Sequence, residues 1–171
     1  AVYEDFRVLM EKEKGIDAVL VATPDHSHAY VAILAMKAGK HVYCEKPLTR
    51  DIWEARTVAK VAAETGVATQ MGNQGRSTEG HRQTAEWIWD GAIGAVREVH
   101  AWGGTFPFAM GRGRPQGEPP VPPGLDWDLW LGPAEWRPYH PAYAPFGWRG
   151  FWAFGGGALP DLAIHHLDPA F

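Results

Sequence analysis

The segment Thr-Pro-Asp-His-Ser-His at residues 23–28 brings two imidazoles and a carboxylate together. It follows a short apolar run at 18–22, rich in β-branched residues, and precedes a helical pattern. Ligands of open α/β sheets bind at the carboxyl ends of the strands, so the two histidines would lie near a bound cofactor. Asp25 and Ser27 could equally do no more than cap the next helix.

A second reactive segment, Glu45-Lys46-Pro47, ends the next apolar run along the chain. A lysine at a strand end can act as an acid or base, or donate a hydrogen bond to a substrate hydroxyl or carbonyl. It can also be an exposed side chain paired with its neighbour Glu45, and position alone favours this reading. The parallel ends of neighbouring strands place Lys46 at the same sheet edge as residues 23–28.

The third reactive segment follows three glycines at 155–157. If residues 161–168 are helical, Asp161 and His165 share one helix face. The carboxylate could orient the imidazole for proton transfer, the two could bind a metal, or they could be a purely structural pair. Spacing alone favours the structural pair, and the absence of further ligands in the pattern makes a metal the least favoured reading.

The elements that must position these residues alternate in type over the first half of the chain. Helix-period and strand-like patterns follow one another with short loops, at 3–13, 18–22, 28–38, 41–45, 51–64 and 67–71. This alternation predicts βαβ units and a parallel, doubly wound sheet. The unbroken apolar run at 18–22 predicts a strand buried on both faces.

The pattern changes after Gly72. A helix is expected at 80–90 and a half-buried strand at 96–102, followed by a Pro/Gly-rich loop at 106–124. Most of the nine tryptophans lie in this half. We therefore expect two domains, 1–73 and 74–171.

Composition narrows the functional classes. A formal net charge of −4 gives no electrostatic reason to expect nucleic acid or an anionic membrane as partner. No apolar run approaches the roughly 18–20 residues of a transmembrane helix, and no signal peptide is visible, so we expect a cytoplasmic protein. The single cysteine, Cys44, cannot form an intrachain disulfide.

Together the motifs resemble the Gfo/Idh/MocA oxidoreductase family. The matching segments are 22–28, 38–48, Asp161-x-x-x-His165 after the glycines, and Asp-Trp-Asp-Leu-Trp-Leu-Gly-Pro at 126–133. The resemblance implies a Rossmann NAD(P) domain followed by an α+β substrate domain with a mostly antiparallel sheet. It implies reversible hydride transfer between NAD or NADP and a carbinol carbon of a sugar, polyol or related compound.

The resemblance also implies roles for individual residues. Lys46 would contact the reacting hydroxyl, His165 would be the general acid/base, and Asp161 would orient it or bind substrate, with His166 in the substrate site. No metal is implied. The nicotinamide and its ribose would lie against residues at the strand ends: Thr23, Pro24, His26, Glu45 and Lys46, with Asn73 and Gln74 beside them.

Two features depart from the family pattern. The Gly-x-Gly-x-x-Gly loop that receives the pyrophosphate is absent from the sequence, and Pro160 stands where many relatives have glycine. We therefore expect the sequence to be part of a longer protein. On its own, we expect the 171-residue chain to bind dinucleotide weakly or not at all, and to be inactive.

Alternative functions remain at this stage. Some relatives oxidise a sugar transiently with bound NAD and so cleave a glycoside, and tryptophans could stack on sugar rings. Core or subunit-interface positions are the favoured reading of those tryptophans. A non-catalytic, truncated binding protein is a further alternative, against which the retention of Lys46, Asp161 and His165 argues. A homo-oligomer is expected for the full-length protein.

Overall fold

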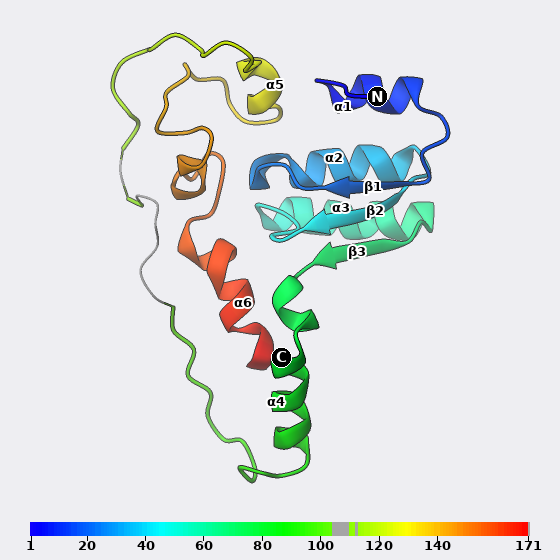
Figure 1. The fold of residues 1–171 in the computed structure, drawn as a ribbon, viewed down its shortest axis with the longest axis vertical. Helices are drawn as coiled ribbons and strands as arrows, with labels where there is room; N and C mark the ends of the chain where they lie inside the picture. Colours follow the sequence, from blue (N-terminus) through cyan, green and yellow to red (C-terminus); the bar gives the residue numbers. More distant parts are fainter. Residues whose placement is uncertain (104–109, 112, 171) are drawn as a thin grey trace.

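The computed structural model describes residues 1–103, 110–111 and 113–170. Its sheet contains three parallel strands in the order β1 (Ala18–Val21), β2 (His41–Glu45) and β3 (Thr69–Gly72). In the register, Val21 lies opposite Cys44, and Glu45 lies opposite Gly72. The carboxyl ends of the strands therefore meet at one edge (Figure 1). The parallel α/β arrangement expected for the first half is confirmed.

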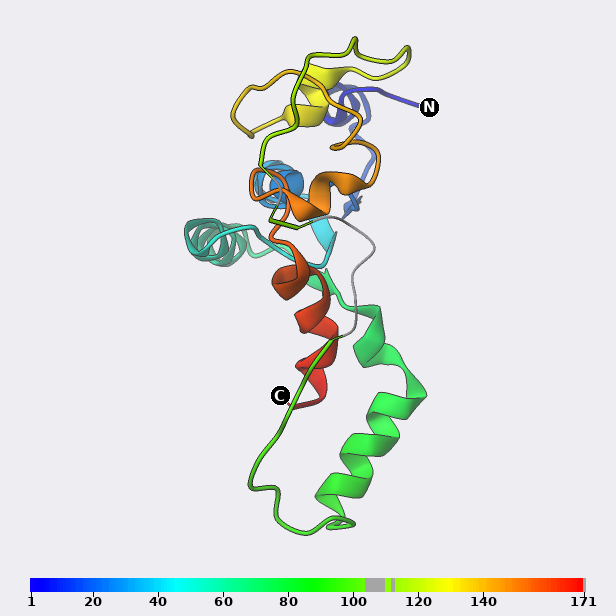
Figure 2. The same cartoon turned by 90° about the vertical axis from the view of Figure 1, so that its left-hand side faces the viewer.

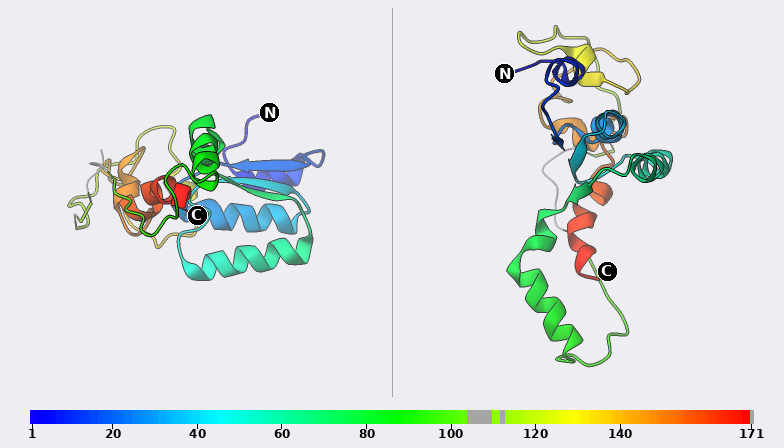
Figure 3. Two further views of the ribbon diagram at one scale, coloured as in Figure 1. Left: turned by 90° about the horizontal axis from the view of Figure 1, so that it is seen from below. Right: turned by 90° about the vertical axis from the view of Figure 1, so that its right-hand side faces the viewer.

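Three helices accompany the sheet: α1 (Phe6–Lys12), α2 (Asp25–Lys37) and α3 (Ile52–Thr65). Figure 3 shows α2 and α3 side by side on one face of the sheet. The core between them and the strands is apolar, and its buried members are Val21, Ala29, Val31, Ala32, Ala35, Met36, Val42, Cys44, Val58 and Val61. Within the described ranges, no helix is long and apolar enough to cross a membrane.

The opposite face of the sheet is open, contrary to the prediction that the first strand is buried on both faces. Leu20 is 65% exposed and Tyr43 is 40% exposed, whereas Val42 and Cys44 on the other face are buried. An apolar run alone does not tell a strand covered on both faces from one covered on a single face.

Helix α2 begins at Asp25, three residues before the predicted start at His28. Its N-cap is Pro24, and no side chain caps it. The alternative that Asp25 or Ser27 caps this helix is therefore excluded: Ser27 Oγ donates to Thr23 Oγ1 at 2.8 Å and to the Pro24 carbonyl at 2.9 Å.

The second half of the chain is mostly helical turns and extended segments. After η1 (Gln74–Ser77), α4 (Glu79–Trp89) extends away from the sheet (Figure 2), and the next helix among the described residues is α5 (Trp127–Leu131). Four short elements follow: η2 (Gly147–Gly150), the π-helix η3 (Leu159–Ala163), α6 (Ile164–His166) and η4 (Asp168–Ala170).

The strand predicted at 96–102 is not formed. Val96, Val99 and Trp102 are 49%, 58% and 80% exposed, and no other described segment pairs with them. Alternation gives a segment the side chains of a strand, but a strand also needs a neighbour for its backbone hydrogen bonds. Part of the predicted loop at 106–124 lies outside the described residues, and its described part contains no helix or strand.

A second, aromatic core holds the C-terminal half against α2. Its buried members are Trp127, Leu131, Tyr143, Ala144, Trp148 and Phe154. The His26 ring packs against Trp130 and Phe154, with ring centres 5.1 Å apart in both cases. The His26 backbone N–H donates to the Phe154 carbonyl at 3.1 Å. Buried tryptophans in this cluster favour the structural reading for Trp127 and Trp148, while Trp136 and Trp152 are exposed.

The close approach of Gly155 to Arg149 generates a prediction about stability. A Cβ at Gly155 would lie 2.8 Å from both the Cα and the carbonyl oxygen of Arg149, which are backbone atoms that cannot move aside cheaply. We expect Gly155→Ala to lower the free energy of unfolding by about 1–3 kcal/mol, measured by urea unfolding. Gly80→Ala is the control, because a Cβ there meets no atom within 4 Å and alanine favours the helix. Equal stabilities of the two variants would contradict the clash.

Candidate active site

The centre of the site is an ion pair between the two halves of the chain. Lys46 Nζ lies 2.5 Å from Asp161 Oδ1 and donates to the Asp161 backbone carbonyl at 2.6 Å. The two side chains are only 16% and 13% exposed. The reading of Lys46 as an exposed lysine paired with Glu45 is therefore wrong: its partner lies 115 positions along the chain, in η3.

The loops after β1 and β2 are tied to each other by His28. One ring nitrogen, Nδ1, lies 2.7 Å from the Pro47 carbonyl oxygen, and the other, Nε2, lies 2.6 Å from that of Thr23. His28 is buried, and its two contacts join the loop after β1 to the loop after β2. The Lys46 backbone N–H donates to the Gly72 carbonyl at 3.0 Å, which fixes the start of the second loop. The Lys46–Pro47 peptide bond is cis.

Asp25 is a buried carboxyl group beside the ion pair. Its pKa is raised to about 7, mainly by burial and then by the Asp161 carboxylate, while Lys46 and Arg149 act in the opposite direction. Asp25 is therefore partly protonated near neutral pH. Its place after the first strand can be read from the sequence, but its burial depends on contacts that the sequence pattern does not reveal.

Arg149 is the site residue that no sequence motif indicates. Its Nε lies 3.9 Å from Asp161 Oδ2, the carboxylate oxygen that Lys46 does not take. Asp161 therefore has a cation on each oxygen. A carboxylate with 13% of its side chain exposed needs such partners, because burial of an unpaired charge is costly.

His165 lies half-buried in α6, four residues after Asp161. Burial lowers its pKa, and the positive charge of Lys46 lowers it further, against smaller opposing effects of Asp161 and Asp168. Among the described residues, no hydrogen bond joins Asp161 to His165. The Asp161 carboxylate accepts a hydrogen bond from Lys46 instead. A neutral imidazole next to a lysine can accept a proton.

Apart from Thr23 and Pro24 in the loop after β1, the remaining predicted residues fall into two groups. Glu45, Asn73 and the exposed Gln74 lie at the carboxyl edge near Lys46, where Asn73 Nδ2 donates to the Ile164 carbonyl at 3.4 Å. Asn73 Oδ1 is buried and has no hydrogen-bond partner among the residues described. A bound donor could satisfy it. The side chain of Glu45 also crowds Gly72, where a Cβ would lie 2.7 Å from Glu45 Oε2.

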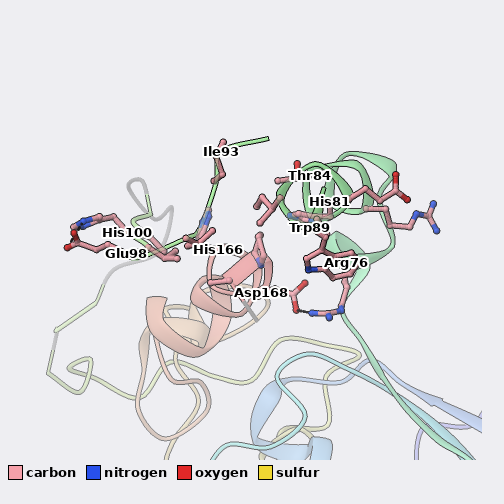
Figure 4. Close-up of a pocket in the computed structure, with 18 of the residues that line it drawn as sticks. Arg76, His81, Thr84, Trp89, Ile93, Glu98, His100, His166 and Asp168 are labelled. Carbon is pink, nitrogen blue, oxygen red and sulfur yellow. Dashed lines mark hydrogen bonds and ion pairs between the residues drawn. The ribbon is translucent and has the colours of Figure 1, made fainter. Parts of the chain in front are cut away.

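His26 and His166 make contacts away from the ion pair. His26 Nε2 lies 3.0 Å from the Trp130 carbonyl oxygen, and burial lowers the pKa of its ring. His166 lines a cavity of about 940 Å³ between α4, residues 93–102 and η4 (Figure 4). Arg76 and Asp168 form an ion pair of 2.7 Å in that cavity, whose lining includes neither Lys46 nor Asp161.

The raised pKa of Asp25 predicts how stability depends on pH. A folded-state pKa of about 7, above the ordinary 3.8, contributes stability that is complete below pH 3.8 and is lost as pH rises through about 7. The loss is at most about 4 kcal/mol, because one pKa unit corresponds to about 1.4 kcal/mol. Urea unfolding at several pH values should show this loss in the wild-type protein and a much flatter profile in Asp25→Asn. Parallel profiles would refute the assignment.

Comparison with known proteins gives a consistent family. A model described as an oxidoreductase family with an NAD-binding Rossmann fold matches residues 1–73, and that family's C-terminal alpha/beta domain matches 99–171. Levoglucosan dehydrogenase of Pseudarthrobacter phenanthrenivorans is 28% identical over 97% of this chain and 35% of its own length. The chain spans about a third, or less, of the length of the curated relatives it matches.

Solved structures agree in fold and sequence. An NAD-binding protein from Listeria innocua has a TM-score of 0.64 at 27% identity and covers 98% of this chain and 39% of that one. An inositol dehydrogenase homolog from Azotobacter vinelandii, complexed with NADH and myo-inositol, has a TM-score of 0.53 at 35% identity and covers 56% of this chain and 26% of that one. With both family models matched in order and the strand-end motifs brought to one edge, the chain belongs to the Gfo/Idh/MocA oxidoreductase family.

Proposed function

We propose that this chain carries substrate-side catalytic groups of an NAD(P)-dependent dehydrogenase that acts on a carbinol carbon of a sugar, polyol or related compound. The observation that carries the proposal is the Lys46–Asp161 ion pair at the carboxyl edge of the parallel sheet, with His165 four residues further on. Family membership supports the reaction type, and the names of relatives that act on levoglucosan and inositol support the substrate class.

Lys46 is suited to bind the reacting oxygen. An ammonium group has three N–H donors, and two are used by the carbonyl and the Oδ1 of Asp161. The third is left for a substrate oxygen. Because both Asp161 contacts hold the ammonium in place before substrate arrives, little reorganisation is needed when the carbinol oxygen binds.

His165 is suited to accept the proton of that hydroxyl. Its lowered pKa keeps the ring neutral near pH 7, as a general base requires. Oxidation of the carbinol breaks its O–H and C–H bonds: the proton passes to a ring nitrogen of His165, and Lys46 stabilises the negative charge that develops on oxygen. In the reverse direction the imidazolium returns the proton.

The strand-end residues fit the nicotinamide half of the cofactor. Thr23 and Pro24 on one loop and Glu45 on the next would flank it, and the buried Asn73 Oδ1 would accept a hydrogen bond from it. When bound, the nicotinamide supplies the acceptor or donor of the hydride. The chain's own residues orient the substrate and move the proton. No Gly-x-Gly-x-x-Gly segment for the pyrophosphate occurs in the 171 residues.

Replacement of Lys46 tests the proposed function. The protein should be produced from the complete reading frame in which this sequence lies, and NADH or NADPH formation followed with sugars, polyols and glycosides. We expect Lys46→Met to lower kcat/KM at least about 100-fold, because it removes the donor to the developing charge. Lys60→Met is the matched control, since Lys60 is an exposed lysine paired with Glu64 on α3.

Three results are informative for that assay. Steady cofactor reduction that Lys46→Met abolishes and Lys60→Met preserves would support the proposal. Release of free sugar from a glycoside, with no build-up of reduced cofactor, would replace it with transient oxidation and glycoside cleavage. Absence of both reactions and of cofactor binding would contradict the proposal that this protein is an enzyme.

The pH dependence of oxidation tests the role of His165. Because its pKa lies below the ordinary 6.5, kcat/KM for alcohol oxidation should hold as pH falls to about 6.5 and decline below it. His165→Asn should remove this acid limb and most of the rate. Asp25→Asn should retain the limb, which separates His165 from the carboxyl group that titrates near pH 7. A limb that vanishes in Asp25→Asn would assign the base to Asp25 instead.

A further inference from the structure

The glycine-rich segment at 155–157 packs against Arg149. The Gly157 N–H donates to the Arg149 carbonyl at 2.9 Å, and Gly155 lies so close that a Cβ would overlap the Arg149 backbone. The three glycines lie between η2 and η3, not between a strand and a helix. They allow the chain to turn back on η2 and then enter η3, which carries Asp161.

The Arg149 side chain is held between aromatic rings. Its guanidinium carbon lies 4.2 Å from the ring centre of Trp148 and 4.6 Å from that of Phe146. Nη1 also donates to the Phe146 carbonyl at 3.3 Å. Cation–π contacts and a backbone hydrogen bond restrict a side chain that would otherwise sample many rotamers. Arg149 is therefore presented to Asp161 in a fixed orientation, with 29% of its side chain exposed.

We propose that Arg149 is a positioning residue that holds Asp161 through Oδ2, so that Lys46 takes Oδ1 and keeps its third N–H for the substrate. This inference rests on the proposed function. With Arg149 at 3.9 Å and Lys46 at 2.5 Å, each carboxylate oxygen faces its own cation. Without Arg149, the carboxylate could rotate and offer both oxygens to Lys46, which would occupy the donor that substrate needs.

Arg149 also shapes the charge around the pair. The groups that face Asp161 are Lys46 after β2, Asp25 at the start of α2, Arg149 in η2 and His165 in α6. Arg149 and Lys46 both lower the pKa of Asp25, against the effects of burial and Asp161. Loss of the guanidinium should therefore raise that pKa, whereas a lysine in its place should largely preserve it.

The test compares Arg149→Met with Arg149→Lys in the protein from the complete reading frame. Methionine preserves an unbranched, polarisable contact with the rings but removes the charge. Arg137→Met controls for damage to the aromatic core, because Arg137 lies over Phe154 at 4.9 Å and does not pair with Asp161. Two readouts are needed: carboxyl titration of Asp25 by ¹³C NMR, and the separate effects on kcat and KM.

In Arg149→Met we expect the Asp25 midpoint to rise by about half a pH unit or more, and kcat to fall about tenfold with a smaller change in KM. Arg149→Lys should restore the midpoint and part of kcat. An unchanged midpoint, or a loss of kcat equal to that of Arg137→Met, would overturn the positioning role. The NMR titration needs no substrate, so it still tests Arg149 if the proposed function fails.

Discussion

The buried ion pair of Lys46 with Asp161 is the interaction on which the rest of the site depends. Two charges taken out of water are stable only where geometry and further hydrogen bonds compensate their lost hydration. Here compensation comes from the Asp161 backbone carbonyl and from Arg149. The pair also requires that two chain segments 115 residues apart meet accurately. Two histidines help to bring these segments together. His26 packs the aromatic core against α2, and His28 joins the loops that follow β1 and β2.

The protonation states of the groups in this site depend on one another. Lys46 lowers the pKa of both His165 and Asp25, and Asp161 acts on both in the opposite direction. A proton gained or lost at one of these groups therefore changes the others. In a water-poor setting these effects are stronger than at an exposed surface. The arrangement can keep an imidazole neutral beside an ammonium, which the proposed proton transfer requires.

Much of the fold could be predicted because local signals sufficed. The strands at 41–45 and near 18–22 are apolar runs between turn residues, and Gly66 ends α3 in the left-handed conformation. The strand predicted at 96–102 is not formed, because an alternating pattern does not provide a neighbouring strand for its backbone hydrogen bonds. The positions of Lys46, Asp161 and His165 followed from motifs, but the Lys46–Asp161 contact and the burial of Asp25 are long-range results. Arg149 stands in no motif, and only the tertiary contact with Asp161 identifies it.

The register of β2 has a consequence for how this chain can change over evolution. Cys44 pairs with both Val21 and Met71, and side chains alternate between a covered and an open face. A one-residue insertion within β2 would turn every following side chain to the opposite face and carry Lys46 away from Asp161. The exposed residues 91–103 pair with no described strand and bear no such constraint. Length variation should therefore accumulate after α4, while β2 keeps its length in functional descendants.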